Sequence, residues 1–140
     1  MRNLFIFVWC AAILIFTCTA SFHDLIHFGV LRFRWDGHPT FSEFLSPFPT
    51  DFSRSLLLQK IGHIIAFQIL TFLLLLKFRS QLIILFLAAS FAALTEFLQL
   101  YFNRGGRIFD IGFDLIGILV ALGLASFFKI TQSRQIDLKH

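Results

Sequence analysis

The stretch QLIILFLAASFAALTEFLQLYFNRGGRIFDIGFDLIGILVALGLASFF, residues 81–128, decides the fold. It holds two apolar segments, 81–101 and 108–128, which are joined by only six residues. Each segment has 21 residues, and a helix of that length rises about 30 Å, the thickness of the hydrocarbon core of a bilayer. A link that short forces the two helices to lie antiparallel and side by side. The stretch therefore predicts a transmembrane helical hairpin.

The composition of the whole chain agrees with this hairpin. Hydrophobic residues make up 57% of the 140 residues and charged residues 14%, and 21 residues are phenylalanine. Soluble domains are nearer to about 45–50% apolar and about 25% charged. A water-soluble chain of this size cannot bury so much apolar surface. The composition excludes a disordered chain and a nucleic-acid binder, and it argues strongly against a soluble enzyme.

Two further apolar segments, 4–20 and 61–78, precede the hairpin. With them, the sequence predicts a single domain over 1–140, an all-α membrane protein with four transmembrane helices arranged up-down-up-down. The first segment follows Arg2 and ends in small residues, so a cleaved secretory signal peptide is an alternative. We favour a retained helix, because the apolar part of a signal peptide is usually shorter.

A long extramembrane loop, 21–60, is expected after the first helix. Its phenylalanines and Trp35 suit the headgroup boundary, and short interfacial helices are expected near Phe41–Leu45 and Phe52–Leu58. The lysines and arginines divide evenly between the two sides of the membrane. Arg2 and the positively charged turn with Lys77 and Arg79 nevertheless favour cytoplasmic termini. The loop would then face outward.

Polar side chains within or at the ends of the helices are the functional candidates, because a charge in hydrocarbon needs a partner or a wet cavity. Three helix ends meet on the side of the long loop, so these residues converge there in either orientation. We expect a polar, ligand-binding pocket made of Lys60, His63, Glu96, Gln99, Arg104, Arg107, Asp110 and Asp114. Gly117 lies on the same helical face as the two aspartates, where it would let another helix approach closely.

A purely structural role is the alternative for these groups. Glu96 could pair with His63 or Lys60, and Asp110 with Arg107, simply to hold the bundle together. The convergence of five titratable residues on one side favours a cavity that binds a polar headgroup or moves a proton.

The motif His23-Asp24-Leu25-Ile26-His27 imitates the zinc motif H-E-x-x-H. Aspartate is one methylene shorter than the usual glutamate, and no clear third ligand follows, although His38 and Glu43 are available. We interpret the motif as an interfacial turn, and we predict neither a metal nor a cofactor from the sequence.

The residues around the hairpin link resemble the VanZ-like membrane family. That family shows Glu-x-x-Gln at the end of one helix, then a loop arginine, then Asp-x-x-x-Asn/Asp-x-x-Gly in the next helix. These positions are Glu96 and Gln99, Arg104, and the series Asp110, Asp114 and Gly117. Arg107 is a rival for the arginine because the spacing is shorter here. Lys60 and His63 fit the family's Asp-Lys-x-x-His, with Gln59 where aspartate is expected.

The resemblance covers roughly residues 56–128 and implies a multi-pass protein of the bacterial cytoplasmic membrane. The family is named for a protein that gives resistance to teicoplanin, a lipid-tailed glycopeptide. Our leading hypothesis is therefore a non-enzymatic envelope protein that binds a lipid, a lipid-linked precursor or a lipoglycopeptide at the outer leaflet. It would contribute to glycopeptide tolerance.

Two hypotheses from other classes remain open. An intramembrane enzyme acting on a lipid or lipid-linked envelope precursor would use His63 and Glu96 as base and orienter. A small transporter or proton path is the third hypothesis, but its polar groups cluster near one side, so a full path would require a homodimer.

Overall fold

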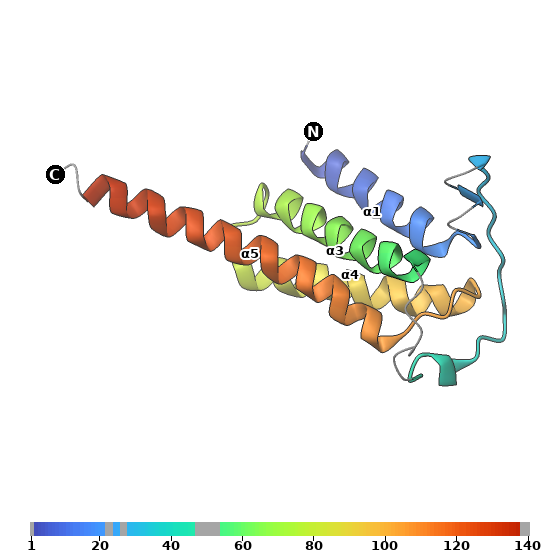
Figure 1. The fold of residues 1–140 in the computed structure, drawn as a ribbon. Coiled ribbons are helices and arrows are strands. Elements are labelled where there is room, and N and C mark those ends of the chain that lie inside the picture. Colours follow the sequence, from blue (N-terminus) through green and yellow to red (C-terminus); the bar gives the residue numbers. More distant parts are fainter. Residues whose placement is uncertain (1, 22–23, 26–27, 47–53, 138–140) are drawn as a thin grey trace.

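The computed structural model describes residues 2–21, 24–25, 28–46 and 54–137. Its described elements are the helices α1 (Arg2–Cys18), α3 (Arg54–Leu75), α4 (Gln81–Tyr101) and α5 (Ile108–Asp137), with the short 3₁₀ helix η1 (Phe41–Glu43). Successive long helices alternate in direction, so the start of α3, the end of α4 and the start of α5 lie at the same end of the bundle (Figure 1).

Three helices are long and apolar enough to cross a membrane: Leu56–Leu75, Gln81–Tyr101 and Ile108–Lys129. This confirms the expected all-helical class for the described residues and the two helices of the hairpin. α1 is shorter, with an apolar part from Asn3 to Cys18, so a fourth span there stays a prediction.

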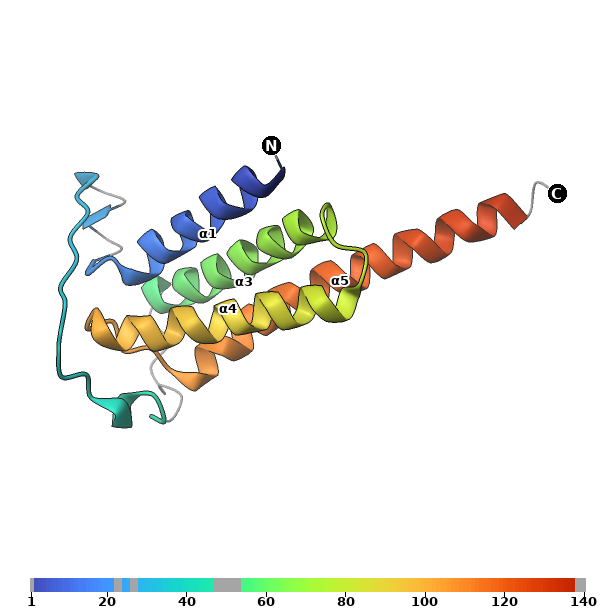
Figure 2. The ribbon, with the colours of Figure 1, turned by 180° about the vertical axis from the view of Figure 1, so that it is seen from behind.

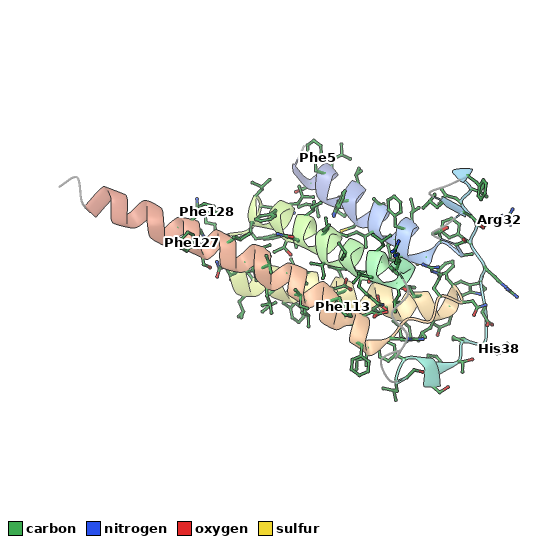
Figure 3. All side chains as sticks on the ribbon, in the orientation of Figure 1. Phe5, Arg32, His38, Phe113, Phe127 and Phe128 are labelled. Carbon is green, nitrogen blue, oxygen red and sulfur yellow. The ribbon has the colours of Figure 1, made fainter. Side chains whose placement is uncertain are left out.

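The surface of the bundle also fits a lipid environment. Large apolar side chains point outward along every long helix, including Phe5, Phe127 and Phe128 (Figure 3), and Leu82 is 77% exposed. A soluble protein rarely leaves so much contiguous apolar surface in water. We therefore treat the chain as a membrane protein.

Three helices differ from their predicted bounds. α1 spans Arg2–Cys18 instead of 4–20. α3 begins at Arg54, seven residues before the predicted start at Ile61, so the loop predicted over 21–60 ends earlier, and α3 ends at Leu75 instead of Phe78. α5 continues to Asp137 instead of ending at Phe128. Hydropathy locates only the part of a helix that suits hydrocarbon, whereas backbone hydrogen bonds continue into polar residues.

The expected interfacial helices of the loop have different outcomes. η1 occupies part of the segment expected to be helical near Phe41–Leu45. The segment expected near Phe52–Leu58 contains the start of α3, while Phe52 and Ser53 lie outside the described residues.

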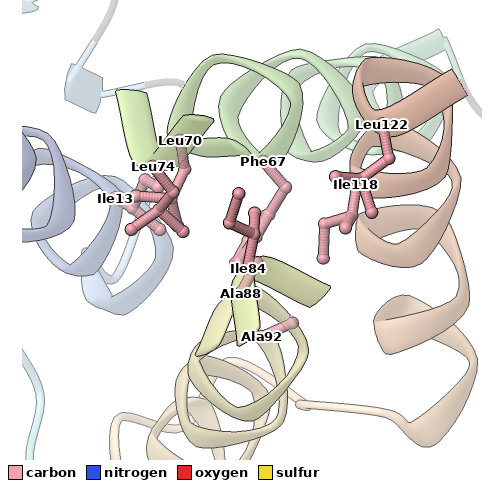
Figure 4. Close-up of a cluster of buried hydrophobic side chains, with 9 residues drawn as sticks. All are labelled: Ile13, Phe67, Leu70, Leu74, Ile84, Ala88, Ala92, Ile118 and Leu122. Carbon is pink, nitrogen blue, oxygen red and sulfur yellow. The ribbon is translucent and has the colours of Figure 1, made fainter. Parts of the chain in front are cut away.

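The core lies where α3, α4 and α5 meet, with one contribution from α1 (Figure 4). Phe67 and Leu70 of α3 are fully buried in one apolar cluster with Ala88 and Ala92 of α4. Small residues let helix backbones approach closely, which is how helices gain van der Waals contact within a membrane. α1 is fixed to this core by Trp9, whose indole Nε1 donates a hydrogen bond to the carbonyl of Ala66 at 2.9 Å.

The loop after α1 passes across the end of the bundle, as seen from both sides in Figures 1 and 2. The backbone N–H of Asp36 donates to the carbonyl of Tyr101 at 2.7 Å, and the Trp35 ring stacks on the Tyr101 ring. Nearby, the N–H of Ile108 donates to the carbonyl of Phe44 at 3.0 Å. These contacts place the loop over the end of the bundle where the predicted polar residues gather.

Candidate functional site

The first contact of the polar cluster joins α3 to α5. The Lys60 ammonium group forms an ion pair with the Asp110 carboxylate, and both side chains are buried. Lys60 Nζ also lies 5.7 Å from the centre of the Phe113 ring. A buried ammonium group is strongly desolvated, so a direct carboxylate partner and an aromatic face are the contacts it requires.

A second contact lies about one helical turn deeper. His63 Nδ1 is 2.9 Å from Asp114 Oδ1 and 3.7 Å from Glu96 Oε1. His63 comes from α3, Glu96 from α4 and Asp114 from α5, and both carboxylates are fully buried. Spacings of three between Lys60 and His63 and four between Asp110 and Asp114 put each pair on one helical face. Two layers of contacts therefore stack between α3 and α5.

Glu96 is oriented by two neutral donors. Gln99 Nε2 donates to Glu96 Oε1 at 2.7 Å, and the backbone N–H of Arg107 donates to Glu96 Oε2 at 3.2 Å. The second bond requires the α4–α5 link to lie directly against α4. A Cβ at Gly106 would overlap the backbone carbonyl of Glu96, so only glycine permits this approach.

The two rival arginines have different positions. The Arg104 guanidinium is half-buried, reaches back to the carbonyl of Ala20 at 3.4 Å, and leaves its Nε without a protein hydrogen-bond partner. Burial lowers the pKa of Arg104 from its ordinary value. Arg107 instead contributes its backbone N–H to Glu96. Arg104 is therefore the arginine whose charged group turns toward α1.

An apolar cleft of about 150 Å³ lies between α1 and α3. Its walls are made mainly of Trp9, Ile13, Phe16, Ala66 and Phe67. Its polar lining consists chiefly of His63, Arg104 and Thr17.

The cleft opens on the outer surface of the bundle. Phe16 and Leu58, which also line it, are 50% and 63% exposed. From Trp9 to Thr17 the α1 wall is about 12 Å long. The cleft thus has an apolar body, an exposed edge and charged or polar groups at the end near the loop.

The predicted site residues thus fall into three groups. Six are buried together: Lys60, His63, Glu96, Gln99, Asp110 and Asp114. Arg104 lines the cleft, and Arg107 contacts the cluster through its backbone. Gly117 lies on α5, where a Cβ would overlap the Ile64 carbonyl of α3.

The ion pairs agree only in part with the purely structural pairing expected from the sequence, because Glu96 does contact His63. Asp110 pairs with Lys60 rather than Arg107, and the histidine lies closer to Asp114 than to Glu96. His23 and His27 of the zinc-like motif lie outside the described residues.

Sequence reasoning missed the cleft and the residues that form it. Trp9 carried one usable signal, because an indole N–H within an apolar helix needs an acceptor. Gly62 and Gly106 gave no such signal in the sequence. The role of Gly62 depends on the open space beside it, and that of Gly106 on its close approach to the Glu96 backbone.

The helical fold, the outward apolar side chains and the buried ion pairs define an α-helical integral membrane protein with a polar cluster at one end. The chain is 36% identical over 128 residues to the uncharacterized membrane protein YwnJ of Bacillus subtilis (strain 168), covering 89% of each chain. It therefore belongs to the same family as YwnJ. No family model matches the sequence, and no solved structure matches it.

Proposed function

We propose that the protein binds a membrane amphiphile in the cleft between α1 and α3. The observation that carries this proposal is the combination of an apolar cleft open at the bundle surface with Arg104 and His63 in its lining. Ligand sites of this kind are largely apolar and contain a few polar groups that orient the ligand.

Each part of an amphiphile has a matching surface in the cleft. An acyl chain fits along Trp9, Phe16 and Phe67, which it can reach sideways from the bilayer past Leu58. An anionic headgroup, such as a phosphate, fits the Arg104 guanidinium, whose Nε has no protein partner. The aromatic loop above the cleft would then face the headgroup region.

With the termini in the cytoplasm, this end of the bundle lies at the outer leaflet. That orientation rests on the charges near the apolar segments. The proposed role in glycopeptide tolerance rests on the resemblance to the VanZ-like family. In that role, a lipid-tailed antibiotic would compete with the membrane amphiphile for the cleft.

Filling the cleft is expected to prevent binding. Gly62 lines the cleft, and a Cβ at this position has nothing within 4 Å. In Gly62→Leu, the side chain enters open space, and leucine also has a higher helix propensity than glycine. Native mass spectrometry in mild detergent with added phosphatidylglycerol should show at least a tenfold loss of affinity, about 1.4 kcal/mol. Arg104→Gln should give a similar loss by removing the charge.

The matched control for the cleft is Gly123→Leu on α5, where a Cβ also has nothing within 4 Å. Arg79→Gln serves as the charge control, because Arg79 is exposed in the link between α3 and α4. Both controls should retain phosphatidylglycerol like the wild type. Equal retention by Gly62→Leu and the wild type would contradict binding in the cleft.

A second candidate function is hydrolysis of a lipid or lipid-linked precursor. It is favoured by His63, which lines the cleft and contacts the Asp114 carboxylate, as a histidine base with a carboxylate orienter would. Incubation with phosphatidylglycerol vesicles should then yield a product detectable by mass spectrometry, reduced about 100-fold or more in His63→Gln. Unchanged lipid after incubation with the wild type would exclude this substrate.

A further inference from the structure

The side chains of His63, Glu96 and Asp114 converge on one point inside the bundle. Each offers one ligand atom, and the three atoms lie within 4.8 Å of one another. In a metal site with bonds of about 2.1 Å, neighbouring ligand atoms are about 3.0–3.4 Å apart. The distances from His63 Nδ1 to Asp114 Oδ1, 2.9 Å, and to Glu96 Oε1, 3.7 Å, lie on either side of that range.

Asp114 supplies an independent observation. Its side chain is fully buried, and its Oδ2 has no hydrogen-bond partner in the protein. Buried carboxylate oxygens are nearly always satisfied by a donor, an ordered water or a cation. The oxygen belongs to the same carboxylate that contacts His63, so a group bound at the convergence point is within its reach.

The charges around Asp114 Oδ2 favour a cation, rather than a further hydrogen-bond donor, as its missing partner. Lys60 is engaged with Asp110, and Arg104 reaches the carbonyl of Ala20. Two buried carboxylates, those of Glu96 and Asp114, are therefore left with one imidazole between them. A divalent ion would balance both charges while the imidazole stays neutral, which is the form in which histidine binds metals.

The glutamate is also held as a metal ligand would be. Gln99 Nε2 and the N–H of Arg107 donate to its two oxygens, and such outer contacts orient ligating carboxylates in metal sites. The three ligands come from α3, α4 and α5, so an ion there would join the three helices that form the core.

We propose that His63, Glu96 and Asp114 form a binding site for a divalent transition-metal ion. One imidazole and two carboxylates suit Zn²⁺ or Mn²⁺. His63 also lines the α1–α3 cleft, so the ion lies beside the ligand-binding surface. The metal site itself does not depend on binding of an amphiphile.

The test uses the full chain, purified in mild detergent through a tag without histidine and stripped with a chelator. Titration with Zn²⁺ should show one ion per chain by calorimetry and elemental analysis. His63→Gln and Asp114→Asn should each weaken Zn²⁺ binding about 100-fold or more. The control His38→Gln removes an exposed loop histidine and should leave binding unchanged.

X-ray absorption at the zinc edge supports the test without any substitution. The wild type should show one imidazole and carboxylate oxygens at about 2.0–2.1 Å, which keeps the proposal testable where a variant does not fold. Three results would overturn the metal proposal: fewer than about 0.1 zinc ions per chain, an absorption spectrum without an imidazole ligand, or unchanged Zn²⁺ affinity in His63→Gln. His63 would then be an ion-pair partner only.

The variant Gly62→Leu separates the metal proposal from the amphiphile proposal. It fills the cleft and leaves the three ligands in place, so it should lose phosphatidylglycerol and retain Zn²⁺. Loss of Zn²⁺ in Gly62→Leu would instead show that the two sites are one.

Discussion

Replacing Gly117 with alanine is expected to lower the free energy of unfolding by about 3 kcal/mol, the upper end of typical overpacking effects. A Cβ at this position would overlap the backbone carbonyl of Ile64 and approach the backbone N of Gln68. Backbone atoms of a packed helix cannot move aside as a flexible side chain can, so α3 and α5 must separate. The measurement is unfolding in mixed micelles during titration with sodium dodecyl sulfate.

The same helix supplies matched controls for this substitution. Gly112 and Gly123 are also glycines of α5, and a Cβ at either has nothing within 4 Å. Alanine there should leave stability unchanged or raise it by up to about 1 kcal/mol, because alanine favours the helix. Equal stability of Gly117→Ala and Gly112→Ala would show that α3 and α5 do not pack through Gly117.

Replacing Lys60 with methionine is expected to lower the free energy of unfolding by about 3–5 kcal/mol. The substitution keeps the length and the apolar part of the side chain but leaves the buried Asp110 carboxylate without its ammonium partner. The loss arises from the unpaired charge that remains. The same micelle titration measures it.

The double variant Lys60→Met/Asp110→Leu separates this effect from packing. Removing both charges should recover most of the lost stability, because an apolar pair of similar volume often replaces a buried ion pair at no cost. Arg79→Met, at an exposed arginine, should change stability by less than about 0.5 kcal/mol. A double variant as unstable as Lys60→Met would show that Asp110 is not the partner that matters.

Much of the fold could be predicted from the sequence, because the thickness of the bilayer sets a minimum length for an apolar segment that spans it. The bounds predicted for α4, 81–101, agree with those observed. The predicted start of α3 and the predicted end of α5 were wrong, because both helices continue past the part of the chain that suits hydrocarbon. The convergence of Lys60, His63, Glu96, Asp110 and Asp114 was also predictable, since helical spacing and short links bring them to one end.

The partners within the cluster were not predictable. Lys60 could reach either Glu96 or Asp110 from its place on the helix, and only the rotation of α3 against α5 pairs it with Asp110. The cleft depends on the distance between α1 and α3, which follows from the Trp9–Ala66 hydrogen bond and the side chains around it.

The sequence by itself therefore determined the membrane class, the helices of the hairpin and the end of the bundle where the charges gather, because these follow from segment length and helical periodicity. Tertiary structure alone decided which carboxylate meets which cation, where the cleft between α1 and α3 opens, and that ligand atoms of His63, Glu96 and Asp114 lie within 4.8 Å of one another. Those features depend on how helices distant in sequence rotate and approach, and small residues such as Gly106 and Gly117 set that approach through contacts with a backbone elsewhere in the chain.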